Sequence, residues 1–129
     1  FVAQQGDLQE ALRLHQRALQ SYEAALGPDH PEVAACLEHL GRALTHADRT
    51  AEALAHHHRA LEIRLATLGA AHRDVAMSHL RIGQAHARAG AVDEARVWFD
   101  RARPVLVREL PEGDPDRAAA VAGPEPNPI

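Results

Sequence analysis

The residues of this chain that could do chemistry are its histidines, ten among 129 residues, and a single cysteine. Imidazole nitrogen is a common zinc ligand, so the run His56-His57-His58 raises metal binding as one hypothesis. Successive helical side chains point about 100° apart, and these three therefore do not converge on one ion. His79 and His86 are separated by about 10.5 Å along a helix, which is too far for joint chelation. We predict no metal site and no cofactor.

Cys36 is followed by His39 at a spacing that lets two side chains touch on a helix. A thiol nucleophile also needs a general base, an orienting group and an oxyanion hole, which are usually assembled from loops. Both residues lie inside a helical pattern, so Cys36 is predicted to be a small packing residue. We expect no catalytic residues and no enzymatic activity.

The composition excludes several classes of partner. Fourteen basic and eighteen acidic residues give a net charge of −4, so the basic footprint of a nucleic-acid-binding protein is absent. The sequence has no apolar run long enough to span a membrane, and one cysteine fits a reducing cytosol. All basic residues are arginine, which is typical of GC-rich bacterial genomes. The composition therefore predicts a cytoplasmic bacterial protein, and the start in mid-pattern predicts a fragment of a longer chain.

The elements that must position these residues follow an internal repeat. LGPDHPEVAACLEHLG, at 26–41, returns 42 residues later as LGAAHRDVAMSHLRIG, and an eroded third copy begins at Leu110. Aromatic residues make up only 3% of the chain, so Ala and Leu must fill closely packed helices. Apolar periodicity and the breaks at Gly27-Pro28, Gly69 and Gly90 predict five long antiparallel helices and a short sixth at 8–26, 31–47, 50–68, 73–89, 92–110 and 116–122.

The two ends of the chain break the pattern. Gly6 is expected to interrupt the backbone after a helical tail at 1–5, and Asp7 with Glu10 would form a capping box for the next helix. After Leu110 the apolar periodicity decays. The expected organisation is a solenoid over 1–122 and a disordered tail, divided into a partial repeat at 1–30, repeats at 31–72 and 73–110, a decayed repeat at 111–122 and the tail at 123–129.

The repeat resembles the tetratricopeptide repeat. The pattern LxxLGxxL at 37–44 is followed by AxxxH at 53–57, and the next unit has HxxIGxxH at 79–86 and AxxxF at 95–99. The 42-residue period and the LGPDHPEVA junction are similar to the kinesin light chain type of this family. The resemblance implies an all-α solenoid of stacked antiparallel helix pairs, with Gly41 and Gly83 where paired helices approach closely.

The resemblance also implies a function and a surface for it. In this family the first helix of each repeat lines a concave face, which places eight residues there: Glu38, Arg42, Thr45, His46, Met77, Arg81, Gln84 and Arg88. The arginines suit an acidic peptide as partner. We expect a protein–protein interaction module or scaffold within a larger cytosolic signalling or regulatory protein. A His-rich metal-binding helical protein and a purely structural spacer are the alternatives, and uncovered terminal repeats predict end-to-end self-association.

Overall fold

The structure is a computed structural model, and it describes the backbone of residues 2–124 and the side chains of residues 6–124. This part of the chain contains no strand and six helices: α1 Val2–Leu26, α2 Pro31–His46, α3 Thr50–Leu68, α4 Arg73–Arg88, α5 Val92–Glu109 and α6 Pro115–Ala122. The all-α class is confirmed, and five of the helices begin and end within one residue of their predicted bounds. Positions 125–129 of the expected disordered tail lie outside the described residues.

The first helix of each repeat begins at the same point of the 42-residue period. Nδ1 of His30 accepts a hydrogen bond from the amide of Glu32 at 3.1 Å, and Nδ1 of His72 accepts one from Asp74 at 3.0 Å. One period later, the carboxylate of Asp114 accepts the amide of Asp116 at 2.8 Å. These caps satisfy amides that a helix start leaves without partners, so the chain sets the repeat boundary locally.

The predicted break at Gly6 is wrong. Helix α1 runs without interruption from Val2 to Leu26, so Asp7 lies inside the helix and does not cap it. One and two periods later, Asp48 and Gly90 take positive φ angles of 61° and 88° and form the turn between paired helices. Gly6 can take either conformation, because glycine in a helix costs only about 1 kcal/mol relative to alanine. The residue type permitted the turn but did not require it.

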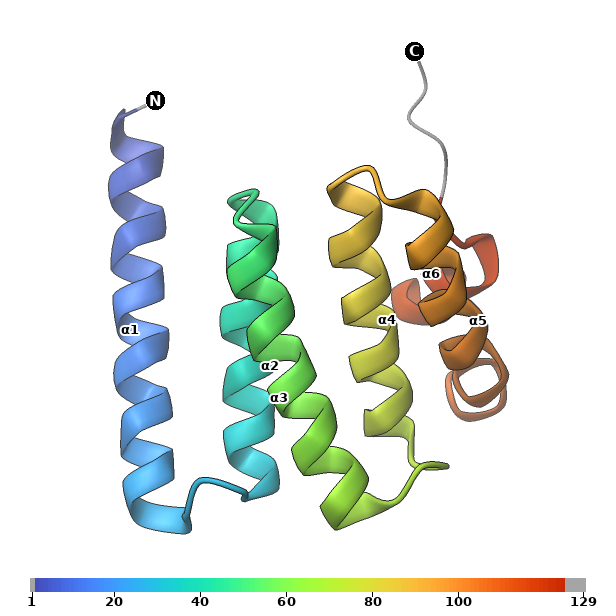
Figure 1. The fold of residues 1–129 in the computed structure, drawn as a ribbon, viewed down its shortest axis with the longest axis horizontal. Coiled ribbons are helices and arrows are strands. Elements are labelled where there is room, and N and C mark those ends of the chain that lie inside the picture. Colours follow the sequence, from blue (N-terminus) through green and yellow to red (C-terminus); the bar gives the residue numbers. More distant parts are fainter. Residues whose placement is uncertain (1, 125–129) are drawn as a thin grey trace.

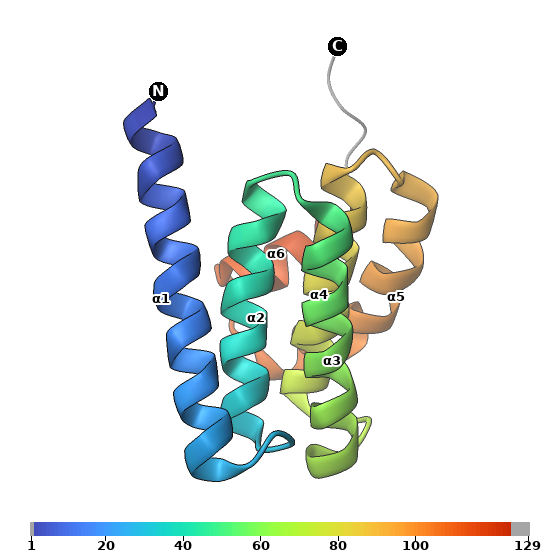
Figure 2. The same ribbon diagram turned by 60° about the vertical axis from the view of Figure 1, so that its left-hand side comes forward.

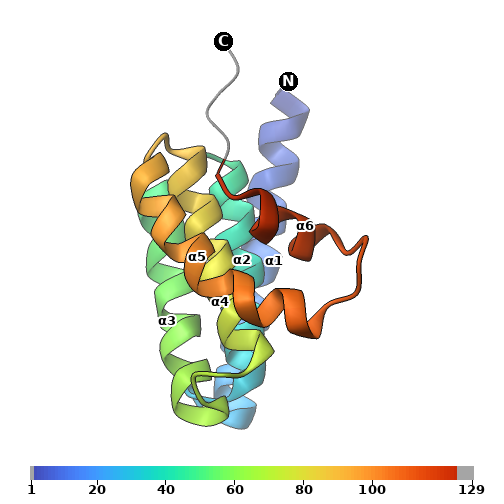
Figure 3. The same ribbon diagram turned by 90° about the vertical axis from the view of Figure 1, so that its right-hand side faces the viewer.

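The helices stack as antiparallel rods in chain order, from α1 at one end to α5 and α6 at the other (Figures 1 and 2). Each helix packs against its neighbours in sequence, and α2 also contacts α4, which in turn contacts α6. Among the described residues, the backbones of α1 and α3 lie farther apart, as do those of α3 and α5, and only side chains reach between them, such as Arg59 to Glu23 and His58 to Trp98. The first helices of successive repeats (α2, α4 and α6) are therefore closer to one another than the second helices (α1, α3 and α5) are. The stack curves around the first helices, and α6 lies beside α4 on the side away from α3 (Figure 3).

Gly41 and Gly83, which occupy equivalent positions of the two repeats, lie where paired helices approach closely, as predicted. A Cβ atom on Gly41 would lie 2.6 Å from the ring of His57, and one on Gly83 would lie 2.8 Å from the ring of Phe99. Both rings are buried, at 1% and 3% exposure. Since His57 and Phe99 stand 42 residues apart, the repeat uses the same ring-on-glycine contact twice.

Candidate functional site

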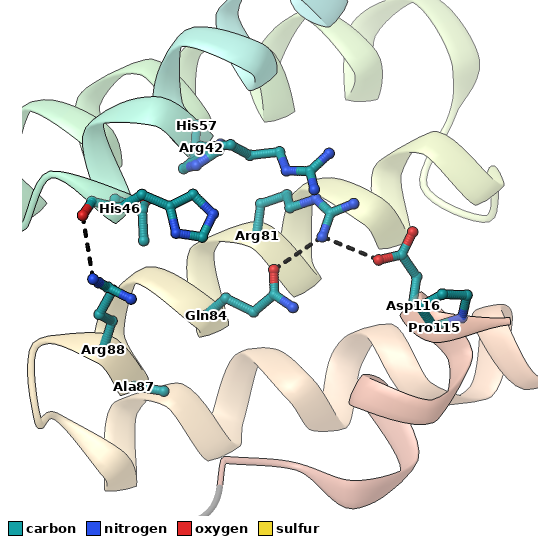
Figure 4. A pocket seen from close by; sticks show the side chains of 10 residues that line it. Arg42, His46, His57, Arg81, Gln84, Ala87, Arg88, Pro115 and Asp116 are labelled. Carbon is teal, nitrogen blue, oxygen red and sulfur yellow. Dashed lines mark hydrogen bonds and ion pairs between the residues drawn. The ribbon is translucent and has the colours of Figure 1, made fainter. Parts of the chain in front are cut away.

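A pocket of about 530 Å³ lies between α2, α4 and α6, with one lining residue from α3 (Figure 4). We call it the groove pocket. It is lined by arginine, histidine and small polar side chains together with the start of α6: Arg42, Thr45, His46, His57, Arg81, Gln84, Ala87, Arg88, Pro115 and Asp116. The groove pocket lies on the inner side of the curved stack, because it is lined mainly by α2, α4 and α6, the helices that are closest to one another across successive repeats.

Four charged side chains are linked at the pocket, and we call them the ion group: Arg81 and Asp116, which line the pocket, and Glu38 and Arg64, which lie beneath it. Arg64 donates to Glu38 at 2.6 Å and to the hydroxyl of Ser78 at 2.9 Å. Arg81 lies 3.7 Å from Glu38 on one side and 3.1 Å from Asp116 on the other. Glu38, Arg64 and Arg81 are 9%, 7% and 5% exposed, so α2, α3, α4 and α6 are joined by largely dehydrated charges.

The surroundings of Glu38 keep it ionised. Burial acts to raise the pKa of this carboxyl, but the guanidiniums of Arg64 and Arg81 outweigh burial and hold the pKa below its ordinary value. A buried carboxylate between two guanidiniums is therefore a stable charge state. It leaves the pair of arginines with one positive charge still to be balanced, and the carboxylate of Asp116 provides that balance.

The upper part of the pocket is more accessible. Arg88 donates through Nε to the carboxylate of Asp48 at 2.9 Å and through Nη2 to the carbonyl of His46 at 3.2 Å. Arg42 is exposed, and no hydrogen bond or ion pair joins it to the other pocket residues drawn in Figure 4. The guanidinium of Arg42 extends towards that of Arg81, so the pocket presents two guanidiniums to its interior.

His57 lines the pocket with both ring nitrogens lacking a hydrogen-bond partner in the described structure. Burial, with the nearby guanidiniums as lesser causes, lowers the pKa of His57 to about 4, although Glu38 acts in the opposite direction. The ring is therefore neutral at physiological pH. Its position against Gly41 makes it first of all a packing residue.

Six of the eight residues predicted for the concave face line the groove pocket: Arg42, Thr45, His46, Arg81, Gln84 and Arg88. The structure places the other two elsewhere. Glu38 lies beneath the pocket as part of the ion group. Met77 packs against the apolar cluster of α4, α5 and α6.

The sequence reasoning missed Arg64 and Asp116. Arg64 stands one period before Leu106, which is fully buried, and Glu38 stands one period before the fully buried Leu80. Charged residues at two positions that are apolar in the next repeat indicate a compensating buried pair. Comparing equivalent positions would therefore have found Glu38 and Arg64, but it would not have found Asp116.

The remaining histidines are dispersed. His56 contacts the carbonyl of Glu52, whereas His58 and His79 flank the ring of Trp98 at 5.4 and 5.6 Å between centroids, and His86 lies 3.4 Å from Glu94. Within the described residues, no three His, Cys, Asp or Glu side chains are arranged to hold a metal ion. The side chains of His56, His57 and His58 thus have different neighbours, as the helical geometry required.

Cys36 and His39 do not form a nucleophile with its base. The ring of His39 stacks near that of His15, with centroids 6.3 Å apart. Burial and the charge of Glu32 raise the pKa of the Cys36 thiol, which is the opposite of what an activated thiolate requires. Cys36 packs at the edge of the apolar cluster formed by α1, α2 and α3.

No helix among the described residues has the length and apolar character needed to cross a membrane.

Comparison with known proteins identifies the fold. The family model described as tetratricopeptide repeat matches residues 1–65 and again 37–106. A crystal structure described as a Podosopora anserina putative kinesin light chain with nearly identical TPR-like repeats, and a structure of a variant of it, match with TM-scores of 0.64 and 0.65. Both are 24% identical to this chain and cover 90% of it, whereas the chain spans 55% of their length. No curated protein matches.

Proposed function

The chain belongs to the tetratricopeptide repeat family, and we propose that it acts as a protein–protein interaction module whose groove pocket binds an acidic segment of a partner protein. Tetratricopeptide repeats in general mediate protein–protein interaction. The module would form part of a larger cytosolic signalling or regulatory protein. The observation that supports the partner's chemistry is Arg42, an exposed guanidinium in a concave pocket with no carboxylate bound to it among the pocket residues (Figure 4).

The geometry favours an extended segment over a compact ligand. Arg42 and Arg88 project from successive first helices, and His46 and Gln84 lie between them on the pocket wall. Guanidinium groups bind carboxylates through paired, charge-assisted hydrogen bonds. A chain that crosses from α2 to α4 would meet both arginines in turn. The interaction should be modest and salt-sensitive, because exposed charge pairs contribute less than about 1 kcal/mol each and are screened by salt.

The test uses arginines that can be changed without disturbing the fold. Reversing the charge of Arg81 is unsuitable, since a carboxylate there would face Glu38 within the ion group. Arg42→Gln and Arg88→Gln are suitable, because both side chains are exposed. Arg96→Gln/Arg108→Gln is the matched control: it also removes two positive charges, both from α5 and away from the pocket, where Arg96 and Arg108 are exposed.

Binding is measured by fluorescence anisotropy with a labelled peptide of Asp, Glu and Ser residues and with a matched peptide of Asn, Gln and Ser. The double variant Arg42→Gln/Arg88→Gln should weaken binding of the acidic peptide by about five- to twentyfold. Arg96→Gln/Arg108→Gln should leave it unchanged, and the neutral peptide should not bind. If the control weakened binding of the acidic peptide equally, the net charge of the protein would explain the loss of affinity, and the groove would not. Undiminished binding in the double variant would place the interface outside the groove and favour the spacer hypothesis for this surface.

A further inference from the structure

The start of α6 places a carboxylate against Arg81, inside the pocket assigned to the partner. Asp116 lies 3.1 Å from a terminal nitrogen of Arg81, and the same nitrogen donates to Gln84 at 3.0 Å (Figure 4). Asp116 is 32% exposed, whereas Arg81 is 5% exposed. The arginine is therefore fixed by its surroundings, and the carboxylate reaches it from the solvent side.

This contact is particular to the last repeat junction. One period earlier, Asp74 stands where Asp116 does, and within the part of the chain that the structure describes its carboxylate pairs with His72, at 3.9 Å, and with no arginine. His39 stands one period before Arg81, so α2 offers no guanidinium at the equivalent position. The pair of Arg81 with Asp116 is thus not a recurring contact that holds each repeat to the next.

The charges of the ion group are balanced only when Asp116 is present. Glu38 compensates one of the two buried guanidiniums, Arg64 and Arg81, and Asp116 compensates the other. Without Asp116, an excess positive charge would remain in a dehydrated site, with Arg42 adding a second. A buried unpaired charge is strongly unfavourable, so the site would favour any carboxylate that entered.

The same site holds buried polar atoms that make no hydrogen bond. The two ring nitrogens of His57, which is 1% exposed, have no partner in the described structure. Nε of Arg81 makes no hydrogen bond there either, and it forms an ion pair with Glu38 at 3.7 Å. Both side chains line the groove pocket. Buried polar atoms in native structures usually have partners, so the ring of His57 has the capacity to bind a water or a polar group of a ligand.

Helix α6 is weakly attached. Of its residues only Ala120 is buried. Arg117 takes the position at which the earlier first helices bury Val33 and Val75, at 0% and 1% exposure, so α6 lacks the apolar contact that holds those helices. Displacing the start of α6 would therefore expose little apolar surface.

We infer that Arg81, together with Arg42, forms a carboxylate subsite of the groove, and that Asp116 occupies this subsite in place of an Asp or Glu side chain of the partner. The segment 111–122 then competes with the partner, and partner binding displaces the start of α6. This inference rests on the proposed function of the groove and assigns the partner's acidic group to one position within it.

The experiment compares three full-length variants with the parent in binding the labelled Asp, Glu and Ser peptide. Asp116→Asn removes the internal carboxylate, and Asp116→Glu keeps it. Glu112→Gln removes one negative charge from an exposed position of the same segment and controls for net charge. Asp116→Asn should bind about fivefold more tightly or better, the factor expected when the parent's site is free about a fifth of the time. Asp116→Glu and Glu112→Gln should bind as the parent does.

Equal affinity of Asp116→Asn and the parent, while Arg42→Gln/Arg88→Gln still weakens binding, would overturn this inference and leave the proposed function intact. A second measurement does not depend on peptide binding. Acetate is added to Asp116→Asn, and the Nε–Hε signal of Arg81 is followed by NMR. A saturable shift that is absent from the parent supports the subsite, and the lack of a shift overturns it. A markedly tighter response to inorganic phosphate than to acetate would overturn the carboxylate assignment in favour of a phosphoryl group.

Discussion

Alanine in place of the helical glycines should change stability in opposite directions at two positions. Gly6 and Gly41 both lie inside helices, so Gly→Ala at either position gains up to about 1 kcal/mol of helix propensity. At Gly6 a new Cβ atom meets nothing within 4 Å. At Gly41 it would lie 2.6 to 2.9 Å from three atoms of the His57 ring. The same chemical change therefore tests packing alone.

The magnitude at Gly41 follows from these distances. Non-bonded carbon contacts are most favourable at about 3.5–4.0 Å, so the ring must move by about 1 Å. His57 is a rigid ring at 1% exposure, and overpacking of this kind costs about 1–3 kcal/mol. After the propensity gain, Gly41→Ala should destabilise the protein by up to about 2 kcal/mol, whereas Gly6→Ala should stabilise it by about 0.5–1 kcal/mol.

Urea unfolding followed by circular dichroism measures both changes. Parallel transitions with an unchanged slope on urea concentration would show that only stability has changed. Gly83→Ala is a further arm, since a Cβ atom there would lie 2.8 Å from Phe99 and 3.3 Å from the backbone oxygen of Ala95. If Gly41→Ala were as stable as Gly6→Ala, the ring-on-glycine contact would not define the distance between paired helices, and the packing argument would fail.

Three other predictions concern titration, the ion group and the uncovered end of the stack. His57 has a pKa of about 4 in the folded protein, whereas an unfolded histidine accepts a proton near pH 6.5. The free energy of unfolding should therefore fall by about 2–4 kcal/mol as the pH drops from 6.5 to 4. His57→Phe, which copies the second repeat, should remove most of this pH dependence when unfolding by urea is measured at each pH. Glu38→Gln leaves two buried guanidiniums with one carboxylate and should lower the free energy of unfolding by about 3–5 kcal/mol; a loss below 1 kcal/mol would contradict the ion group's role. On α1, the apolar side chains of Leu14 and Tyr22 are 52% and 41% exposed, which favours association between molecules. Sedimentation should therefore detect concentration-dependent association, and Leu14→Glu should weaken it. A protein that stays monomeric at all concentrations would refute this prediction.

The helices could be predicted from the sequence because their boundaries are set locally. The glycines that follow α1 and α3 and the caps that precede α2, α4 and α6 lie within a few residues of the helices they bound, and the 42-residue echo repeats each boundary. Gly6 was mispredicted because its residue type tolerates both a helix and a turn. The equivalent turn at Gly90 is held by hydrogen bonds to the last turn of α4, from the amide of Gly90 to Ala87 and from that of Ala91 to His86.

The groove could be predicted only in part. Arg42 and Arg88, which the first-helix rule assigned to the concave face, both line the pocket, because a helical period determines which residues share a face. The rule assigned Glu38 to the same face, since a pattern within one helix does not show which charged residues are buried. Glu38 and Arg64 are 26 residues apart on different helices, and their pairing depends on how α2 packs against α3. Periodicity within one helix contains no information about that contact.

The ion group links the stability of the fold to the strength of the groove, and this limits which variants can report on binding. Glu38 neutralises much of the charge that Arg81 would otherwise present to a partner, so removing Glu38 would both strengthen the anion subsite and destabilise the protein. A gain in affinity measured there would be ambiguous. Asp116 contacts the same guanidinium from the exposed side, and its removal changes the charge of the site while leaving the bond between Arg64 and Glu38 in place. Asp116 is therefore the position at which the chemistry of the groove can be separated from the packing that holds it.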